Sequence, residues 1–350
     1  MVTEQEILAA LSQVKDPELH RDLVSLGMIK DVAVEGGLVN FTLELTTPAC
    51  PFNAQIEAEA KAAVAALPGV EEVRVKTSAQ VRARKERQAL PGVKHTLAIG
   101  SGKGGVGKST VAVNLAVALA EMGAGVGLLD ADIYGPSIPA LMGIREQPRS
   151  DGQKILPLER YGVRLMSIGF ILPEGAPVIW RGPMIAGALQ QFLRDVAWGE
   201  LDYLLIDLPP GTGDIQLTLC QAIPLSGAVI VMTPQDVATE IGSKTLAMFR
   251  QLRVPILGII ENMSYFICPH CEQPTEIFDR GGGKRASERL GVPFLGEVPL
   301  DVEVRIGGDE GRPILIRDPE SAIADAFRQV ARNLAGRISV ETIGVLAPAG

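Results

Sequence analysis

The sequence predicts an α/β protein in which a doubly wound, mostly parallel sheet follows a small α+β domain. From residue 95 onward, short apolar segments alternate with helical segments, which is the order expected of a parallel sheet covered by helices. Most of these segments are apolar throughout, as expected of strands that are buried on both faces. The first 77 residues instead contain strands in which apolar and polar residues alternate.

The composition suits a folded protein of two domains. The chain has 350 residues, of which 47% are hydrophobic and 21% charged, which allows a sizeable core. Its formal net charge of −8 argues against a broadly basic face for nucleic acid. No apolar run approaches the roughly 18–20 residues that cross a bilayer, and the N-terminus lacks the basic start of a signal peptide. We therefore expect a cytoplasmic protein with no nucleic-acid or membrane partner.

The small domain is expected over residues 1–77. Two alternating strands flank Glu35-Gly36-Gly37, which predicts a β-hairpin. An alanine-rich helix follows and ends at Pro68-Gly69, before a last short strand. The expected elements are a helix at 4–14, strands at 29–34 and 38–45, a helix at 54–67 and a strand at 71–75.

Two segments outside the domains are predicted to be irregular. Residues 78–93 are polar and end in Pro-Gly, which indicates a linker. The basic run 82–87 within it is either a solvated connector or a contact for an acidic partner. Residues 338–350 contain no Lys or Arg and are expected to form a loose C-terminal tail. The large domain therefore occupies residues 94–337.

The large domain is predicted to carry its site at one edge of the sheet. Nucleotides bind at the carboxyl ends of the strands in sheets of this kind. The predicted strands are 96–100, 125–129, 164–168, 203–207, 228–232, 256–261 and 294–298.

A complete phosphate-binding loop follows the first of these strands. Residues 102–109, GKGGVGKS, fit the P-loop pattern GxxxxGK[ST] and open a helix at 109–122, as the motif requires. The glycines let backbone N–H groups turn toward phosphate oxygens, and the helix N-terminus adds positive potential. Lys108 is expected to reach the β- and γ-phosphates of ATP, Ser109 to bind Mg²⁺, and Thr110 to support the phosphates. The residues assigned to nucleotide binding here are Gly102, Lys103, Gly104, Gly105, Val106, Gly107, Lys108, Ser109 and Thr110.

Charged residues near the loop are predicted to complete an ATP-hydrolysing site. Lys103, a second lysine inside the loop, either faces solvent or reaches a nucleotide held by another subunit. Asp207 ends an apolar strand, where a carboxylate that assists Mg²⁺ belongs. Asp130 and Asp132 end another strand, and one of them, preferably Asp132, is expected to orient the attacking water. For Asp130 the alternative is a helix cap.

Two of the four cysteines form a CxxC pair. Cys268 and Cys271 can hold one metal centre through two thiolates, but zinc or a four-iron cluster requires four ligands. Two copies related by a two-fold axis would supply four. On spacing alone, structural zinc, thiol redox chemistry and an iron–sulfur cluster remain open. Cys220 is predicted to be a core thiol, and Cys50 to be either a reactive thiol before a helix or a buried loop residue.

These motifs together resemble a known family. The doubled-lysine loop KGGVGKST resembles the deviant Walker A ATPases of the MinD/ParA class. Over about residues 95–335 the chain resembles one branch of that class, the Mrp/ApbC iron–sulfur cluster carrier ATPases. The segments that carry this resemblance are DADIYGPSIP (130–139), DLPPGTGD (207–214), ENMS (261–264) and CPHC (268–271). Residues 1–77, with DPEL (16–19) and TTPACP (46–51), resemble a SufT-like iron–sulfur assembly domain.

The resemblance implies an ATP-hydrolysing carrier that works as a homodimer. It implies that Lys103 acts across the dimer interface and that Asp132 lies in a switch segment. It also implies a labile [4Fe–4S] cluster between the paired cysteines, with an assembly scaffold and apo iron–sulfur proteins as partners. Asn262 would lie near adenine, with Val298-Pro299-Leu300 as the other wall of the base site; a turn-forming role is the alternative for Asn262.

Two other functions fit parts of this pattern. A ParA- or MinD-like partitioning or positioning ATPase shares the loop chemistry, but it would need a DNA- or membrane-binding surface. A zinc-bridged ATPase dimer would use the same cysteine pair as a structural site.

Overall fold

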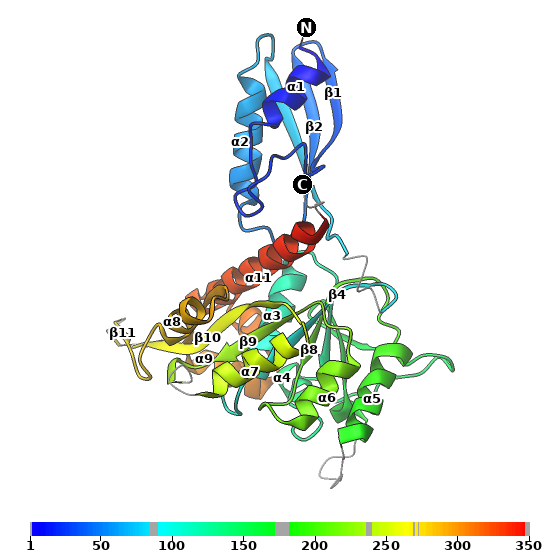
Figure 1. Cartoon of the computed structure of the whole chain (residues 1–350), viewed down its shortest axis with the longest axis vertical. Coiled ribbons are helices and arrows are strands. Elements are labelled where there is room, and N and C mark those ends of the chain that lie inside the picture. Colours follow the sequence, from blue (N-terminus) through cyan, green and yellow to red (C-terminus); the bar gives the residue numbers. More distant parts are fainter. Residues whose placement is uncertain are drawn as a thin grey trace. The chain divides into compact units, whose positions relative to one another are not determined.

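The computed structural model describes residues 2–83, 90–171, 182–235, 240–268, 270–271 and 273–346 (Figure 1). Two compact units divide the chain: one is Met1–Ala83 with Ala335–Gly350, and the other is Arg84–Leu334. Each unit has a buried hydrophobic cluster of its own. None of the described helices is long and apolar enough to cross a lipid bilayer.

The small unit contains a three-stranded sheet packed with two helices. β1 (Ile29–Glu35) and β2 (Leu38–Leu45) form the predicted antiparallel hairpin, in which Gly36 has a φ of 63° that favours glycine. β3 (Glu72–Ala79) pairs with β2 in parallel. Alternate side chains of β2 are buried together with residues of α1 (Glu4–Leu11) and α2 (Asn53–Ala65).

The C-terminal segment differs from its prediction. Residues from 338 onward were expected to form a loose end, but α11 (Ala322–Leu346) is helical to its last described residue. Ile343 joins the buried core of the small unit. The buried residues recur three or four positions apart, which is the spacing of one helix face. They are Ala335, Ile338, Ser339, Thr342 and Ile343.

A mostly parallel sheet forms the centre of the large unit, as predicted. The strand order is β11-β10-β9-β4-β8-β5-β7-β6, with β12 beside β10. Of the described strands, β6 and β11 run antiparallel to their neighbours and the others run parallel. The bounds are β4 (Val93–Gly100), β5 (Val126–Asp130), β6 (Leu158–Arg160), β7 (Val163–Ser167), β8 (Leu201–Asp207), β9 (Gly227–Met232), β10 (Ile256–Ile267), β11 (Pro274–Thr275) and β12 (Phe294–Leu300).

Helices connect these strands and bury the sheet (Figure 1). Side chains of α5, α6, α7 and α8 share one hydrophobic cluster with the sheet. α3 contacts β4, β5, β7, β8 and β9, and most of its residues are buried. The helices are α3 (Lys108–Glu121), α4 (Ile138–Leu141), α5 (Gly182–Asp195), α6 (Asp214–Ala222), α7 (Glu240–Gln251), α8 (Gly282–Leu290), α9 (Val302–Glu310) and α10 (Ile314–Arg317).

The strands predicted for the large unit are present, with differences at the ends. β10 continues past residue 261 to Ile267, so the strand leads directly into the cysteine pair. β6 and β11 were not predicted because they are too short to show a pattern. β3 and β4 take residues from both ends of the predicted linker 78–93, of which residues 84–89 lie outside the described part of the chain.

Candidate functional site

The loop between β4 and α3 has a backbone that suits a phosphate group. Gly105 and Gly107 have φ values of 80° and 77°, which side chains rarely tolerate. Gly107 is also the N-cap of α3, and no described side chain caps the helix there. The N–H groups of the first turn of α3 are therefore available to phosphate oxygens.

Lys108, Ser109 and Asp207 form a polar cluster at the base of this loop. The Lys108 Nζ lies 2.5 Å from Asp207 Oδ1, and the Ser109 Oγ donates to Asp207 Oδ2 at 2.5 Å. The Lys108 side chain is 6% exposed and that of Asp207 is fully buried. Burial raises the pKa of the Asp207 carboxyl, and the Lys108 ammonium opposes this shift. The structure thus brings together the cation, hydroxyl and carboxylate that the sequence assigned to ATP and Mg²⁺.

This cluster fits a magnesium ion that is shared with a nucleotide. Among the described residues, no group of three or more His, Cys, Asp or Glu side chains could hold a metal ion. Mg²⁺ in nucleotide sites takes one or two protein oxygens and completes its shell with phosphate oxygens and water. Ser109 and Asp207 offer such oxygens beside the phosphate loop.

Asp130 and Asp132 take different positions at the end of β5. Asp130 is fully buried and accepts hydrogen bonds from Asp132 N at 3.1 Å, Ile138 N at 3.2 Å and Ser167 Oγ at 3.1 Å. It therefore anchors the segment leading into α4 from the end of β5, while the N-cap residue of α4 is Ser137. Asp132 is half-buried, and burial raises the pKa of its carboxyl, while Lys108 lowers it. The role of Asp132 in orienting water stays a prediction.

The start of the loop is tied to the segment that follows Asp207. Gly211 N donates to the Ser101 carbonyl oxygen at 3.0 Å, and the Ser101 Oγ donates to the Lys103 carbonyl oxygen at 2.9 Å. The Lys103 side chain is half-buried. Its proposed action on a nucleotide of a second copy stays a prediction.

Asn262 contacts the phosphate loop. Its Nδ2 donates to the Val106 carbonyl oxygen at 2.9 Å, so this N–H is directed at the loop backbone rather than into a base site. Val298 is opposite Asn262 in the pairing of β10 with β12, and Pro299, which follows Val298, is buried. The structure therefore brings these residues together, and the contact of Asn262 and Pro299 with adenine stays a prediction.

The cysteine pair lies in the turn that joins β10 to β11. Cys268 N donates to the Gln273 carbonyl oxygen at 3.1 Å and closes this hairpin. The N–H groups of His270 and Cys271, and then the Cys271 thiol, lower the pKa of Cys268. Cys271 is exposed and Cys268 is partly exposed. Two accessible sulfur atoms, one of them with a lowered pKa, suit binding of a soft metal centre.

The two other cysteines are not prepared for thiolate chemistry. Cys220 is buried on α6, and burial raises its pKa to about 12, which agrees with a core thiol. Burial raises the pKa of Cys50 to about 11, and the carboxylates of Asp16 and Glu18 add to this shift. The Phe52 N–H at the start of α2 opposes the shift but is the smaller effect. This favours the buried-loop interpretation of Cys50 over a reactive thiol.

A polar cluster between β10 and β12 was not predicted from the sequence. Glu261 is fully buried and accepts hydrogen bonds from Gly281 N and Gly283 N at the start of α8. The Ser264 Oγ lies 2.5 Å from Glu261 Oε1 and 2.9 Å from Glu297 Oε2. The sequence signal for it was Glu261, a carboxylate at the end of an apolar predicted strand. A carboxylate that is buried needs hydrogen-bond partners.

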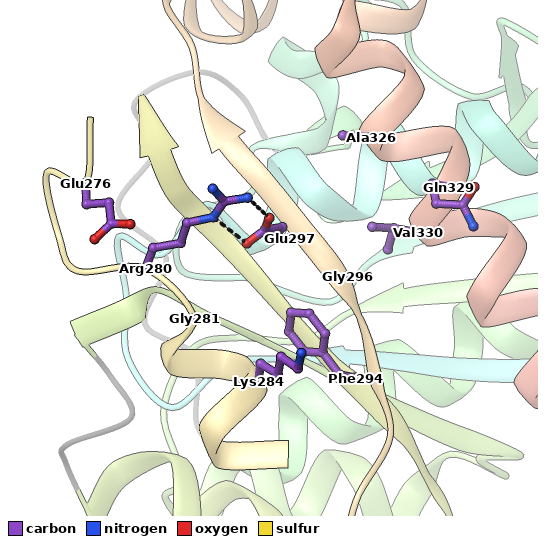
Figure 2. A pocket seen from close by; sticks show the side chains of 10 residues that line it. All are labelled: Glu276, Arg280, Gly281, Lys284, Phe294, Gly296, Glu297, Ala326, Gln329 and Val330. Carbon is purple, nitrogen blue, oxygen red and sulfur yellow. Dashed lines mark hydrogen bonds and ion pairs between the residues drawn. The ribbon is translucent and has the colours of Figure 1, made fainter. Parts of the chain in front are cut away.

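Arg280 completes this cluster. Its guanidinium pairs with the Glu297 carboxylate and lies over the Tyr265 ring, 4.1 Å from the ring centre. Arg280 lowers the pKa of Glu297 through this hydrogen-bonded contact. Figure 2 shows the ion pair at the edge of a cavity of about 620 Å³, which Phe294 and Val330 also line.

Two family matches cover most of the chain. Residues 92–335 match the family described as NUBPL iron-transfer P-loop NTPase. Residues 4–76 match the family described as iron-sulfur cluster assembly protein.

Curated relatives match over nearly the full length. An iron-sulfur cluster carrier protein of Deinococcus radiodurans is 53% identical over 97% of each chain. The protein of the same name from Synechocystis is 51% identical over 98% of this chain and 100% of the relative.

Solved structures resemble about two thirds of the chain. A nucleotide-binding protein of Archaeoglobus fulgidus in complex with ADP is 42% identical, with a TM-score of 0.60, over 68% of this chain and 92% of that one. The septum site-determining protein MinD of Pyrococcus horikoshii is 24% identical, with a TM-score of 0.50, over 68% of this chain and 94% of its own. This second likeness supports the fold alone.

Proposed function

We propose that this chain, which belongs to the family of NUBPL iron-transfer P-loop NTPases, is an ATP-dependent carrier of iron–sulfur clusters. In this proposal a homodimer binds a labile [4Fe–4S] cluster between its two Cys268/Cys271 pairs and transfers it to apo iron–sulfur proteins. The observation that carries the proposal is the double role of β10. One residue of this strand binds the phosphate loop, and its end leads into the cysteine pair.

ATP would bind at the base of the phosphate loop. Phosphate oxygens would accept hydrogen bonds from the backbone N–H groups at the start of α3. The Lys108 side chain would turn from Asp207 toward the β- and γ-phosphates. Ser109 and Asp207 would hold Mg²⁺, which when bound neutralises charge on the phosphate oxygens. Because Lys108 is nearly buried, water would screen the attraction between its charge and the phosphates only weakly.

Hydrolysis would use two residues at the margin of this cluster. Asp132 lies where both Lys108 and Asp207 affect its pKa, so its carboxylate would be near the γ-phosphate and could orient water. Lys103 of a second copy would stabilise the charge that develops on the γ-phosphate, as an arginine finger supplied in trans does.

The cluster at the cysteine pair would be a cargo rather than a resident cofactor. Each chain offers two accessible sulfur atoms, and two chains related by a two-fold axis would offer the four that a [4Fe–4S] cluster binds. The backbone N–H groups that stabilise a thiolate at Cys268 would help it to bind iron. Exposure of both sulfur atoms would let thiolates of an acceptor protein replace them one by one.

Timed transfer of a reconstituted cluster tests this function. The protein is reconstituted without oxygen and mixed with an apo-acceptor, with and without Mg-ATP. We expect about four iron and four sulfide per two chains and a transfer rate that depends on Mg-ATP. If the protein takes up zinc but no iron and sulfide under these conditions, the zinc-bridged dimer replaces the carrier.

A further inference from the structure

Asn262 sets the orientation of one peptide in the phosphate loop. Its hydrogen bond holds the Val106 carbonyl oxygen, and a trans peptide points its C=O and N–H in opposite directions. The bond therefore turns the N–H of Gly107 away from Asn262. The contact is close, because a Cβ atom on Gly107 would lie 2.2 Å from the Asn262 Nδ2. A shift of Asn262 would move the backbone that is to bind phosphate.

β10 is distorted immediately after Asn262. Met263 has a φ of 56°, and the pairing of β10 with β12 shifts register between Asn262 and Phe266. Successive side chains of a regular strand lie on opposite faces. Here atoms of both Asn262 and Met263 lie within 4 Å of the Cβ position of Gly107. The distortion thus directs two consecutive side chains at the loop, and such a left-handed residue persists where its surroundings hold it.

The strand is held again just beyond this distortion. Ser264 contacts the carboxylates of Glu261 and Glu297, and Tyr265 lies beneath the guanidinium of Arg280. Arg280 and Glu297 are themselves an ion pair (Figure 2). These contacts fix β10 to β12 and to the start of α8, so the strand cannot move at one end without moving these partners.

The same strand reaches the cysteine pair without an intervening loop. Phe266 pairs with Thr275 and Ile267 with Pro274, and Cys268 follows directly. Asn262 and Cys268 are six positions apart. At about 3.3 Å per residue, this corresponds to roughly 20 Å along an extended strand.

From this geometry we propose that nucleotide and cluster binding are coupled through β10, with Asn262 as the positioning residue at the nucleotide end. The proposal rests on the proposed carrier function and states how its two sites are regulated. A nucleotide that draws in the loop peptide after Val106 moves Asn262, and the strand passes this shift to Cys268. Because Ser264 contacts Glu297 and Tyr265 lies against Arg280, which pairs with Glu297, the distorted part of the strand moves as one body with β12.

Reciprocal affinity is the measurement that tests this coupling. Two coupled ligands change each other's affinity by the same factor. Calorimetry without oxygen gives the dissociation constant of Mg-ADP for the metal-free and the cluster-reconstituted full-length protein. ADP is used because it is not hydrolysed. For the wild type we expect the two constants to differ by about fivefold or more.

Matched amide variants separate coupling from loss of stability. Asn262→Asp keeps the size of the side chain but removes the N–H that donates a hydrogen bond to the Val106 carbonyl oxygen. Asn333→Asp is the control, because Asn333 Nδ2 likewise donates to a strand carbonyl, that of Leu295, at 2.8 Å. We expect the ratio of the two constants to fall to about one in Asn262→Asp and to keep its wild-type value in Asn333→Asp.

A second variant addresses the contact of β10 with β12 at Ser264 and decides the test if Asn262→Asp does not fold. Glu297→Gln removes the charge partner of Arg280, and we expect it to lower the ratio as well. A wild-type ratio of one, or a wild-type ratio retained in both variants, overturns the coupling. Iron and sulfide are assayed in the same samples. If the wild type holds no cluster, the carrier function itself fails; if it holds one and the ratio is one, the coupling alone fails.

Discussion

The phosphate loop and the cysteine hairpin hold their reactive groups in opposite ways. At the loop, Lys108 and Asp207 are buried and paired, and the glycine backbone is already shaped for phosphate. At the hairpin, Cys271 is exposed, and backbone N–H groups are the principal support of the Cys268 sulfur. Burial with matched partners fixes a group in place, whereas exposure leaves it open to exchange. The difference suits a site for catalysis on one side and a site for cargo on the other.

Removing both sulfur atoms of the hairpin should abolish cluster binding and leave nucleotide binding unchanged. In Cys268→Ala, Cys271→Ala we expect no cluster after reconstitution, because the remaining cysteines have raised pKa values and are not prepared as thiolates. Mg-ADP affinity of the metal-free protein should not change. Visible absorption, iron assay and calorimetry measure these effects. Cys220→Ala is the control and should keep its cluster; a wild-type cluster content in the double variant would refute the assignment.

Lys108→Ala should reduce both nucleotide binding and the stability of the fold. Nucleotide binding should be lost, and the Asp207 carboxyl would remain buried without its counter-charge, at a cost of about 3–5 kcal/mol in the free energy of unfolding. Lys94→Ala is the control, since the Lys94–Asp202 pair at 2.7 Å is more exposed. Its loss should cost about 1 kcal/mol or less. Urea unfolding compares the two variants, and equal losses would contradict the contrast between them.

The buried carboxyl of Asp130 should make stability depend on pH. Burial, and then the nearby Asp207, raise its pKa to about 8, above an unfolded value near 3.9. Between these values the folded protein binds a proton that the unfolded chain lacks. The free energy of unfolding should therefore fall as pH rises from about 4 to about 8, by up to about 1.4 kcal/mol per pH unit. Urea unfolding from pH 5 to pH 8 measures this slope. It should be reduced in Asp130→Asn, and an identical slope would refute the shift.

The smallest expected effect concerns a buried amide on α6. Gln216 is 2% exposed, and both polar atoms of its side chain lack a hydrogen-bond partner within the described part of the chain. Gln216→Met keeps the length of the side chain and removes this unfavourable burial, so the free energy of unfolding should rise by about 1 kcal/mol. Gln329→Met, on the exposed side of α11, should change it little. Thermal and urea unfolding test both, and a loss of stability in Gln216→Met would show that the amide has a partner.

The phosphate loop and the sheet were predictable because their signals are local. The motif around Lys108 combines a strand, a turn and a helix within a few residues, and uniformly apolar segments indicate strands buried on both faces. The expected core position of Cys220 followed from its helical neighbours in the same way. Each of these predictions depends on residues that are adjacent in the chain.

The contacts around β10 were not predictable from one sequence because their partners are distant in the chain. The Asn262 amide binds a carbonyl 156 positions away, and Glu297 reaches Ser264 across a strand pairing. The left-handed residue Met263 has no local sign such as glycine or asparagine. The end of α11 was misjudged for another reason: the lack of basic residues concealed a regular helix face that includes Ile343.

Native mass spectrometry of the reconstituted protein, kept free of oxygen, shows whether two chains share one cluster. We expect one dominant species that contains two chains and a single four-iron, four-sulfide cluster, and that loses the cluster when Cys268 and Cys271 are replaced. A single chain that carries the whole cluster, or a dimer that carries zinc or no metal at this hairpin, would contradict it.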